Sequence, residues 1–137
     1  MTEPDNAAGR FPDRLSGFRE LVSYRVVAWS RHTASIALML GPEHLNRMGI
    51  VHGGVYMTIL DAAMGHAATY APPGSPRLKC VTVSMSTNFM ASTRGGTIIA
   101  TGQLRSVEGA IAVCEGRVTA EDGTELMLAQ GTFKYLS

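Results

Sequence analysis

Asp61 is the residue with the clearest chemical potential, because it is the only acid between Glu43 and Glu108. It lies in the middle of an apolar stretch, residues 53–71, with the sequence GGVYMTILDAAMGHAATYA. A carboxylate in apolar surroundings is strongly disfavoured unless it is paired or hydrogen-bonded. We therefore expect Asp61 either to be satisfied by a neighbouring hydroxyl or Arg side chain, or to serve as a general base or nucleophile.

Two adjacent glycines, Gly53 and Gly54, open the same stretch and follow the segment NRMGIVH, residues 46–52. Glycines at a helix start leave backbone N–H groups accessible, and the helix dipole there favours developing negative charge. Such N–H groups can hold the oxygen of an attacked carbonyl as an oxyanion hole, although a glycine pair also simply turns a chain into a helix. No Lys-Ser/Thr pair follows and no G-x-G-x-x-G is present, which excludes the common phosphate-binding loops.

The spacing of Gly53 and Asp61 restricts how they could act together. Eight positions of helix separate them by about 12 Å, at about 1.5 Å per residue. A base and an oxyanion donor must each lie within about 3 Å of the reacting group, so one helix cannot supply both to one carbonyl. A second copy running antiparallel could place its Gly53 beside Asp61, as two-fold symmetry permits. If the two residues cooperate, the protein is at least a dimer with shared sites.

The hydrophobic pattern predicts the elements that must position these residues. The length of the apolar stretch favours a helix over 53–71 that ends at Pro72, and its nearly uniform apolarity places it inside the fold. Period-two patterns predict strands over 21–30, 33–40, 78–90, 97–107, 110–119 and 125–136. Between them, the pairs Gly95-Gly96, Glu108-Gly109 and Asp122-Gly123 suit hairpin connections. The sequence thus predicts an antiparallel sheet wrapped around one buried helix.

Length and composition indicate one domain. The chain has 137 residues, for which we predict a lead-in over 1–19, with a short helix as one option, and a single domain over 20–137. The net charge of +1 argues against a protein that coats nucleic acid. With 45% hydrophobic and only 17% charged residues, disorder is excluded and a homo-oligomer is the simplest interpretation. The N-terminus lacks a secretory signal and no apolar run suits a membrane span, so we expect a cytoplasmic protein.

The cysteines and histidines do not form recognisable ligand sets. Cys80 and Cys114 are too few for a disulfide framework or a four-ligand zinc site, and we expect both to pack as small core residues. His44, His52 and His66 lack the spacing of a metal site, so no metal is expected.

The run NRMGIVHGGVYMTILDAAMGHA resembles the Asn-x-x-Gly-x-x-His-Gly-Gly…Asp-x-Ala signature of hotdog-fold acyl-CoA thioesterases, above all their phenylacetate-pathway and 4-hydroxybenzoyl-CoA-like branch. The likeness extends loosely through VTVSMSTNFMASTRGG to AQGTFKYL and covers roughly residues 20–137. The resemblance implies an α+β fold, with one long helix wrapped by five or six antiparallel strands. It also implies a homodimer with shared sites, assembled as a dimer of dimers into a homotetramer. No cofactor is implied, since coenzyme A is part of the substrate.

The resemblance also assigns roles to single residues. Asp61 matches the carboxylate that activates water or attacks the thioester, and Gly53 matches the N–H that polarises the carbonyl of a substrate held by the opposite subunit. His52 and Asn46 match side chains that arrange the motif loop, the carbonyl or the water, and Thr82 falls where a Ser or Thr orients the water. Residues assigned to binding of the acyl group or of coenzyme A are Gly54, Met57, Met64, Asn88 and Arg94.

Charge supports a coenzyme A ester as the substrate. Residues 44–107 contain five basic side chains and one acid, and this local basic excess suits the phosphates of coenzyme A. The predicted function is hydrolysis of an aromatic or medium-chain acyl-CoA to a free acid and coenzyme A. Two alternatives stay open: a regulator that binds acyl-CoA without chemistry, and a hotdog dehydratase of hydroxyacyl thioesters. A buried acid gives a pure binder no advantage, and a dehydratase would use a different His-and-acid motif.

Overall fold

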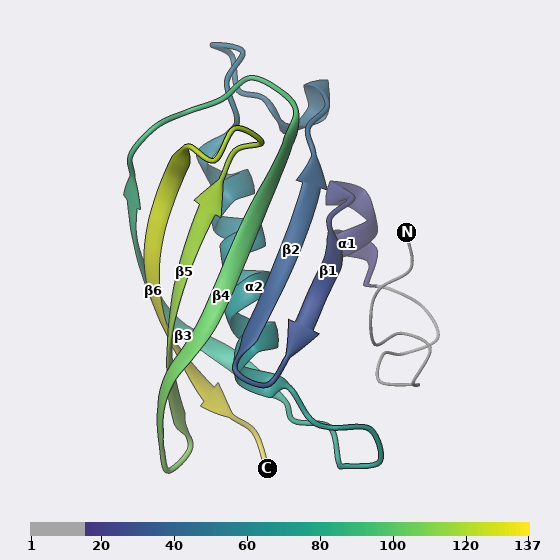
Figure 1. Cartoon of the computed structure of the whole chain (residues 1–137), viewed down its shortest axis with the longest axis vertical. Helices are drawn as coiled ribbons and strands as arrows, with labels where there is room; N and C mark the ends of the chain where they lie inside the picture. Colours follow the sequence, from purple (N-terminus) through teal and green to yellow (C-terminus); the bar gives the residue numbers. More distant parts are fainter. Residues whose placement is uncertain (1–15) are drawn as a thin grey trace.

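The computed structural model describes residues 16–137. Within this part of the chain a curved sheet wraps around one long helix, with a short helix beside the first strand (Figure 1). The helices are α1 (Gly17–Val22) and α2 (Gly53–Thr69), and a 3-10 turn, η2, spans Pro42–His44. The strands are β1 (Arg25–Ser30), β2 (Thr33–Met39), β3 (Cys80–Phe89), β4 (Thr97–Glu108), β5 (Ile111–Thr119) and β6 (Glu125–Tyr135). The predicted α+β hotdog architecture is confirmed, with six strands in the sheet.

The strand order β1-β2-β4-β5-β6-β3 shows which connections are hairpins. Neighbouring strands all run antiparallel, and the turns at Glu108-Gly109 and Asp122-Gly123 join paired strands as predicted. The hairpin predicted at Gly95-Gly96 is wrong, because β3 pairs with β6 and β4 pairs with β2 and β5. The chain instead crosses from the edge of the sheet into its interior. Turn residues signal a bend, but the partner of a strand is chosen by the whole sheet.

The start of the domain also differs from the prediction. A strand was expected from residue 21, but the chain forms α1 as far as Val22. Ser16 begins this helix by accepting the Arg19 N–H at its Oγ, 3.1 Å away. Ser23 ends it with a positive φ of 73°. The helix that was an option for the lead-in therefore begins at Gly17, and residues 1–15 lie outside the described part of the chain.

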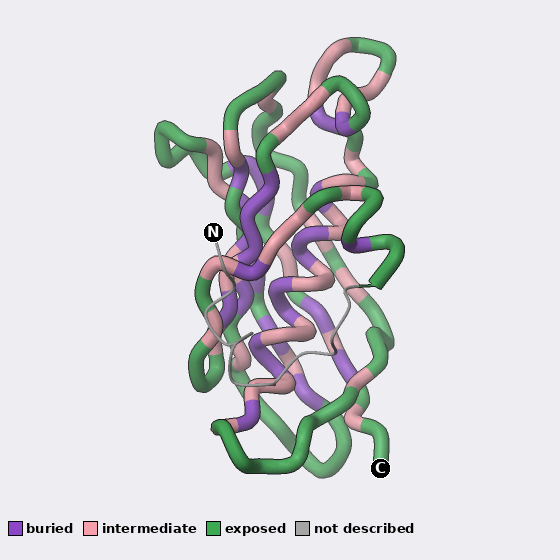
Figure 2. The backbone as a smooth tube through the Cα atoms, turned by 90° about the vertical axis from the view of Figure 1, so that its right-hand side faces the viewer, coloured by how far each residue is buried: buried purple, intermediate pink, exposed green. Residues whose placement is uncertain are grey.

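Helix α2 packs one face into the sheet. His52 precedes the helix in an extended conformation, and Pro72 and Pro73 follow soon after its end at Thr69. Its fully buried face contributes much of the core (Figure 2). At Gly102 on β4 the sheet approaches the helix so closely that a Cβ would lie 2.5 Å from the backbone of Ala63. The residues of the buried face are Tyr56, Ile59, Leu60, Ala63, Met64, Ala67 and Ala68.

The opposite face of α2 is only partly buried, so the helix is not enclosed on all sides as its apolar sequence predicted. Met57, Asp61, Gly65 and His66 are only partly buried, because they line an open groove. Their periodic spacing places them along one side of the helix. No helix in residues 16–137 has the length and apolarity needed to cross a membrane.

Candidate active site

Asp61 and Thr82 form the polar centre of a groove of about 770 Å³ beside α2. The Thr82 hydroxyl donates a hydrogen bond of 2.6 Å to Asp61 Oδ1. The expectation that a hydroxyl satisfies this acid is therefore confirmed. Among the described residues, Oδ2 of Asp61 accepts no hydrogen bond. Thr82 thus orients the carboxylate and leaves one of its oxygens for a water molecule or a substrate.

A β-bulge in β3 directs Thr82 toward Asp61. Thr82 pairs with Phe133 of β6, but the next paired residue is Ser84, so Val83 is an extra residue in the strand. An extra residue reverses which side chains face the helix. Before the bulge the even-numbered Cys80 and Thr82 line the groove, and after it the odd-numbered Met85 does so. The hydroxyl reaches Asp61 because of this irregularity.

The N-terminus of α2 forms a second, separate polar site. His52 Nδ1 accepts the N–H of Gly54 at 2.8 Å, which caps the helix. The N–H of Gly53, the first residue of the helix, has no acceptor among the described residues. Gly53 lines a cavity of about 350 Å³ together with Asn46 and Phe89. This cavity presents a free backbone donor where the helix dipole favours negative charge.

Asn46 and Arg94 hold the loop that leads to this donor. The Asn46 side-chain oxygen accepts the N–H of Met48 at 2.9 Å and that of Ile50 at 3.4 Å. Arg94 Nη1 donates to the carbonyls of Met48 and Gly49, at 3.0 and 3.2 Å. Asn46 therefore arranges the loop, which is one of the roles that the resemblance implied. Arg94, which was assigned to coenzyme A, binds the same loop from the segment between β3 and β4.

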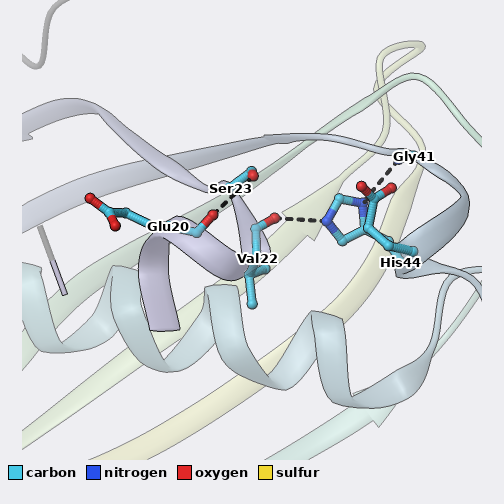
Figure 3. Close-up of polar contacts among 6 residues, drawn as sticks. Glu20, Val22, Ser23, Gly41 and His44 are labelled. Atoms are coloured by element: carbon cyan, nitrogen blue, oxygen red, sulfur yellow. Dashed lines mark hydrogen bonds and ion pairs between the residues drawn. The ribbon is translucent and has the colours of Figure 1, made fainter. Parts of the chain in front are cut away.

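His44 is a positioning residue that the sequence analysis considered only as a metal ligand. It is buried, and its Nδ1 accepts the Gly41 N–H at 2.9 Å while its Nε2 contacts the Val22 carbonyl at 2.7 Å (Figure 3). A carbonyl can only accept, so Nε2 carries the proton and the ring is neutral. The His44 carbonyl in turn accepts the His52 N–H at 2.9 Å. His44 thus links the end of α1 to the start of α2, and no spacing signal in the sequence marks this role.

The groove around Asp61 contains several other titratable side chains, among them Lys79, His66 and Cys80. Burial lowers the pKa of His66, whose Nδ1 donates to the Ala62 carbonyl at 2.7 Å. Burial raises the pKa of the Tyr24 hydroxyl and, together with the Asp61 charge, that of the Cys80 thiol. Asp61 is the only acid that lines the groove.

Cys114 packs in the core as expected, whereas Cys80 lies at its edge. Cys114 is fully buried, and burial raises the pKa of its thiol to about 12. Cys80 is half-buried and lines the groove. Within residues 16–137 no three His, Cys, Asp or Glu side chains gather as metal ligands would.

The remaining binding candidates are dispersed. Met57 lines the groove. Met64 does not, because it points toward the sheet and is fully buried beneath Gly116 and Gly131, so it packs as core instead of lining an acyl site. Gly54 and Asn88 are both exposed, and neither lines the groove or the Gly53 cavity.

Asp61 and Gly53 are not brought together within one chain. They lie on the same straight helix, and each opens into its own cavity. The separation predicted from the sequence is therefore confirmed. Within one chain, the carboxylate therefore lies in one cavity and the backbone donor in the other.

Comparison with known proteins identifies the family. A family model described as the thioesterase superfamily matches residues 48–127, which include the loop, α2 and most of the sheet. The chain therefore belongs to the thioesterase superfamily. The resemblance inferred from the motif is confirmed.

Solved structures agree on the fold. The conserved protein PA5202 from Pseudomonas aeruginosa matches with a TM-score of 0.82 and 25% identity, over 91% of this chain and 100% of that one. The PaaI protein from the phenylacetic acid degradation operon of E. coli matches with a TM-score of 0.80 and 18% identity, over 89% of this chain and 86% of that one. Thioesterase HI1161 from Haemophilus influenzae matches with a TM-score of 0.82 and 12% identity, over 100% of this chain and 92% of that one. No curated protein matches the sequence significantly.

Proposed function

We propose that this protein hydrolyses an acyl-CoA thioester to a carboxylic acid and coenzyme A. The acyl group is aromatic, which the sequence resemblance favours, or an aliphatic group of medium length. The observation that carries the proposal is the hydrogen bond of 2.6 Å that holds Asp61 in an open groove, with Oδ2 left for the reaction. Membership of the thioesterase superfamily supports the reaction class.

Asp61 can act in either of two ways. As a general base it takes a proton from water, the hydroxide oxygen bonds to the thioester carbon, and the C–S bond breaks as the thiolate leaves and is protonated. As a nucleophile its carboxylate bonds to the carbonyl carbon and expels the thiolate, and water then hydrolyses the resulting anhydride. Thr82 orients Asp61 in both routes. Isotope from labelled water that enters the Asp61 side chain in a single turnover would identify the second route.

The carbonyl oxygen needs a preorganised hydrogen-bond donor, such as a free backbone N–H at a helix N-terminus. Gly53 has a free N–H, but it lies in the other cavity, two turns or more of helix from Asp61. We therefore propose that Gly53 of a second copy completes the site. Two-fold symmetry then yields two equal sites, each with one residue from each chain.

The edge strand β3 is the surface that supports such a dimer. β3 pairs only with β6, so its other edge has no strand partner among the described residues. It also exposes large apolar side chains, with Val83 57% and Phe89 58% accessible. An exposed apolar edge favours pairing with another strand. Because Thr82 lies on β3 and Phe89 lies beside Gly53, a partner on this edge lies next to both half-sites. Following the resemblance, two such dimers would form a tetramer.

Arg94 remains our candidate for contact with the phosphates of coenzyme A. Its guanidinium lies at the loop that precedes Gly53, where it is exposed. The helix dipole favours negative charge at this point, and the planar guanidinium adds several N–H donors that suit a phosphate group.

The proposal is tested by thiol release from a panel of acyl-CoA esters. The native protein should release free thiol from at least one ester, and Asp61→Asn should reduce this rate by about a thousandfold with the fold retained by circular dichroism. Asp61 is partly exposed, so the variant should fold. Unchanged turnover in Asp61→Asn contradicts the role of Asp61. Tight binding of acyl-CoA without thiol release from any ester would show a binding protein instead.

A further inference from the structure

Gly65 is a glycine in the interior of α2, where glycine weakens a helix relative to alanine. Such a position normally requires a reason. A positive φ would be one, but the positive-φ glycines of the described chain do not include Gly65. Close approach of another backbone would be a second reason.

Close approach does not explain this glycine either. A Cβ at Gly65 would meet only the Phe133 ring, at 3.8 Å, which is an ordinary contact. At Gly102 and Gly131, by contrast, a Cβ would lie 2.5 Å from the helix backbone and 2.9 Å from Phe133. Within residues 16–137, packing thus requires the glycines that face α2 from the sheet, but it does not require Gly65.

The missing side chain of Gly65 lies at the reaction centre. Gly65 follows Asp61 by four residues, so the two share one face of α2 and are about 6 Å apart along its axis. Both line the same groove of about 770 Å³. Phe133, the neighbour of the absent Cβ, lines the groove as well. Any side chain at this position would therefore occupy space beside Asp61.

The groove that Gly65 lines is suited to an acyl group. Its lining includes Phe18 and Tyr24 from the start of the domain and Leu78 from the segment before β3, along with the polar side chains of Thr69 and Lys79. Apolar surface predominates in the groove, whereas coenzyme A carries phosphates that require water or cations. An acyl group whose carbonyl lies at Asp61 and which extends along this face of α2 would pass over Gly65.

We infer that Gly65, by having no side chain, sets the width of the groove where the acyl group binds. It thereby decides how large an acyl group the protein accepts. This inference rests on the proposed thioesterase function. It assigns the absence of a side chain to substrate selection, because alanine at this position would make the helix more stable than glycine does.

The test compares Gly65→Ala and Gly65→Val with the native protein. The probes are acetyl-CoA, hexanoyl-CoA and phenylacetyl-CoA, with kcat/KM measured by thiol release. In Gly65→Val the ratio of kcat/KM for phenylacetyl-CoA to that for acetyl-CoA should fall about tenfold or more. For Gly65→Ala this ratio should lie between those of the native protein and Gly65→Val. Its Tm should be higher than that of the native protein. Gly95→Ala is the matched control, since its new Cβ meets nothing within 4 Å and its loop is outside the groove.

Three results would overturn the inference. An equal loss with every ester would mean that the new side chain blocks coenzyme A or disturbs Asp61. An unchanged ratio would mean that the acyl group does not cross Gly65. A change of oligomeric state in Gly65→Val, measured by light scattering, would mean that the glycine serves packing between copies.

A binding measurement separates this inference from the proposed function. Thioether analogues of the same esters cannot be hydrolysed, and their Kd values are measured by calorimetry. If the native protein binds them but releases no thiol from esters, only the hydrolase proposal fails. The inference then stands if Gly65→Val weakens the phenyl analogue about tenfold more than the methyl analogue, and it falls if both weaken equally or if no analogue binds.

Discussion

The Thr82 hydroxyl donates to Asp61 across 2.6 Å, although 21 positions separate the two residues in the sequence. Asp61 lies on α2 and Thr82 on the edge strand β3, so the contact depends on how the strand is placed against the helix. The bulge at Val83 turns Thr82 inward, and the hydrogen bond then fixes the carboxylate. A local irregularity of one strand thereby sets the orientation of the Asp61 carboxylate.

Removal of the Thr82 hydroxyl should slow catalysis without unfolding the protein. Thr82→Val keeps the shape and β propensity of the side chain but removes the donor, so Asp61 loses its fixed orientation. We expect kcat for an accepted ester to fall about tenfold or more, whereas Thr82→Ser should retain most of it. Steady-state kinetics with both variants checks this. Equal activity of Val and Ser at this position would show that the hydrogen bond has no catalytic role.

Two inactive variants should restore activity when they are mixed. Asp61→Asn removes the carboxylate, and Gly53→Pro removes the free N–H at the first helical position, where proline is tolerated. In a mixed dimer, one site combines the intact Gly53 of one copy with the intact Asp61 of the other. Co-refolding of equal amounts should therefore give about a quarter of native turnover, since half of the dimers are mixed and each has one good site.

The same mixing experiment has an informative negative result. If Asp61 and Gly53 act within one chain, every mixed dimer contains only defective sites, and no activity returns. Each variant refolded alone is the control. Light scattering on the mixture confirms that dimers have formed.

His66 should make the protein less stable in mild acid. Burial lowers its pKa below 6.5 in the native state, and the charges of Arg19 and Arg77 act in the same direction. Below pH 6.5 the unfolded chain then binds a proton that the native state resists, so the free energy of unfolding falls with pH. The decline should begin near pH 6.5 and level off below the native pKa. Thermal unfolding between pH 5 and 8 measures it.

The matched variant for this effect is His66→Gln, which keeps a polar side chain but does not titrate. The difference in Tm between native and variant protein should shrink or reverse as the pH falls below 6.5. A constant difference over this range would show that His66 does not contribute to the acid sensitivity.

Loss of His44 should weaken the connection between α1 and α2. In His44→Ala the Gly41 N–H and the Val22 carbonyl lose their partner in a buried position. Each lost hydrogen bond contributes about 1 to 2 kcal/mol, so the free energy of unfolding should decrease by about 2 to 4 kcal/mol. Urea denaturation measures it. Glu43→Ala is the control, because Glu43 is 67% exposed and lies 3.9 Å from the ring, and its effect should be small.

The amino-acid sequence determined the local parts of this protein. The uninterrupted apolar run and the prolines after it predicted α2, and the ends of β4, β5 and β6 agree with the period-two patterns within about two residues. The sole acid of the central region and the glycine eight positions earlier indicated the two candidate functional groups. Helix geometry alone then kept these groups apart. These features depend on neighbours along the chain, which is why the sequence contains them.

Tertiary structure decided which distant segments meet. The sequence did not show that β3 leaves its neighbour β4 and pairs with β6, nor that Val83 forms a bulge and directs Thr82 to Asp61. It also did not show that His44 joins two helices or that Met64 points into the core. Strand pairing and side-chain direction result from the packing of the whole sheet around α2. A pattern within one strand cannot determine them, because a shift of one residue reverses every side chain.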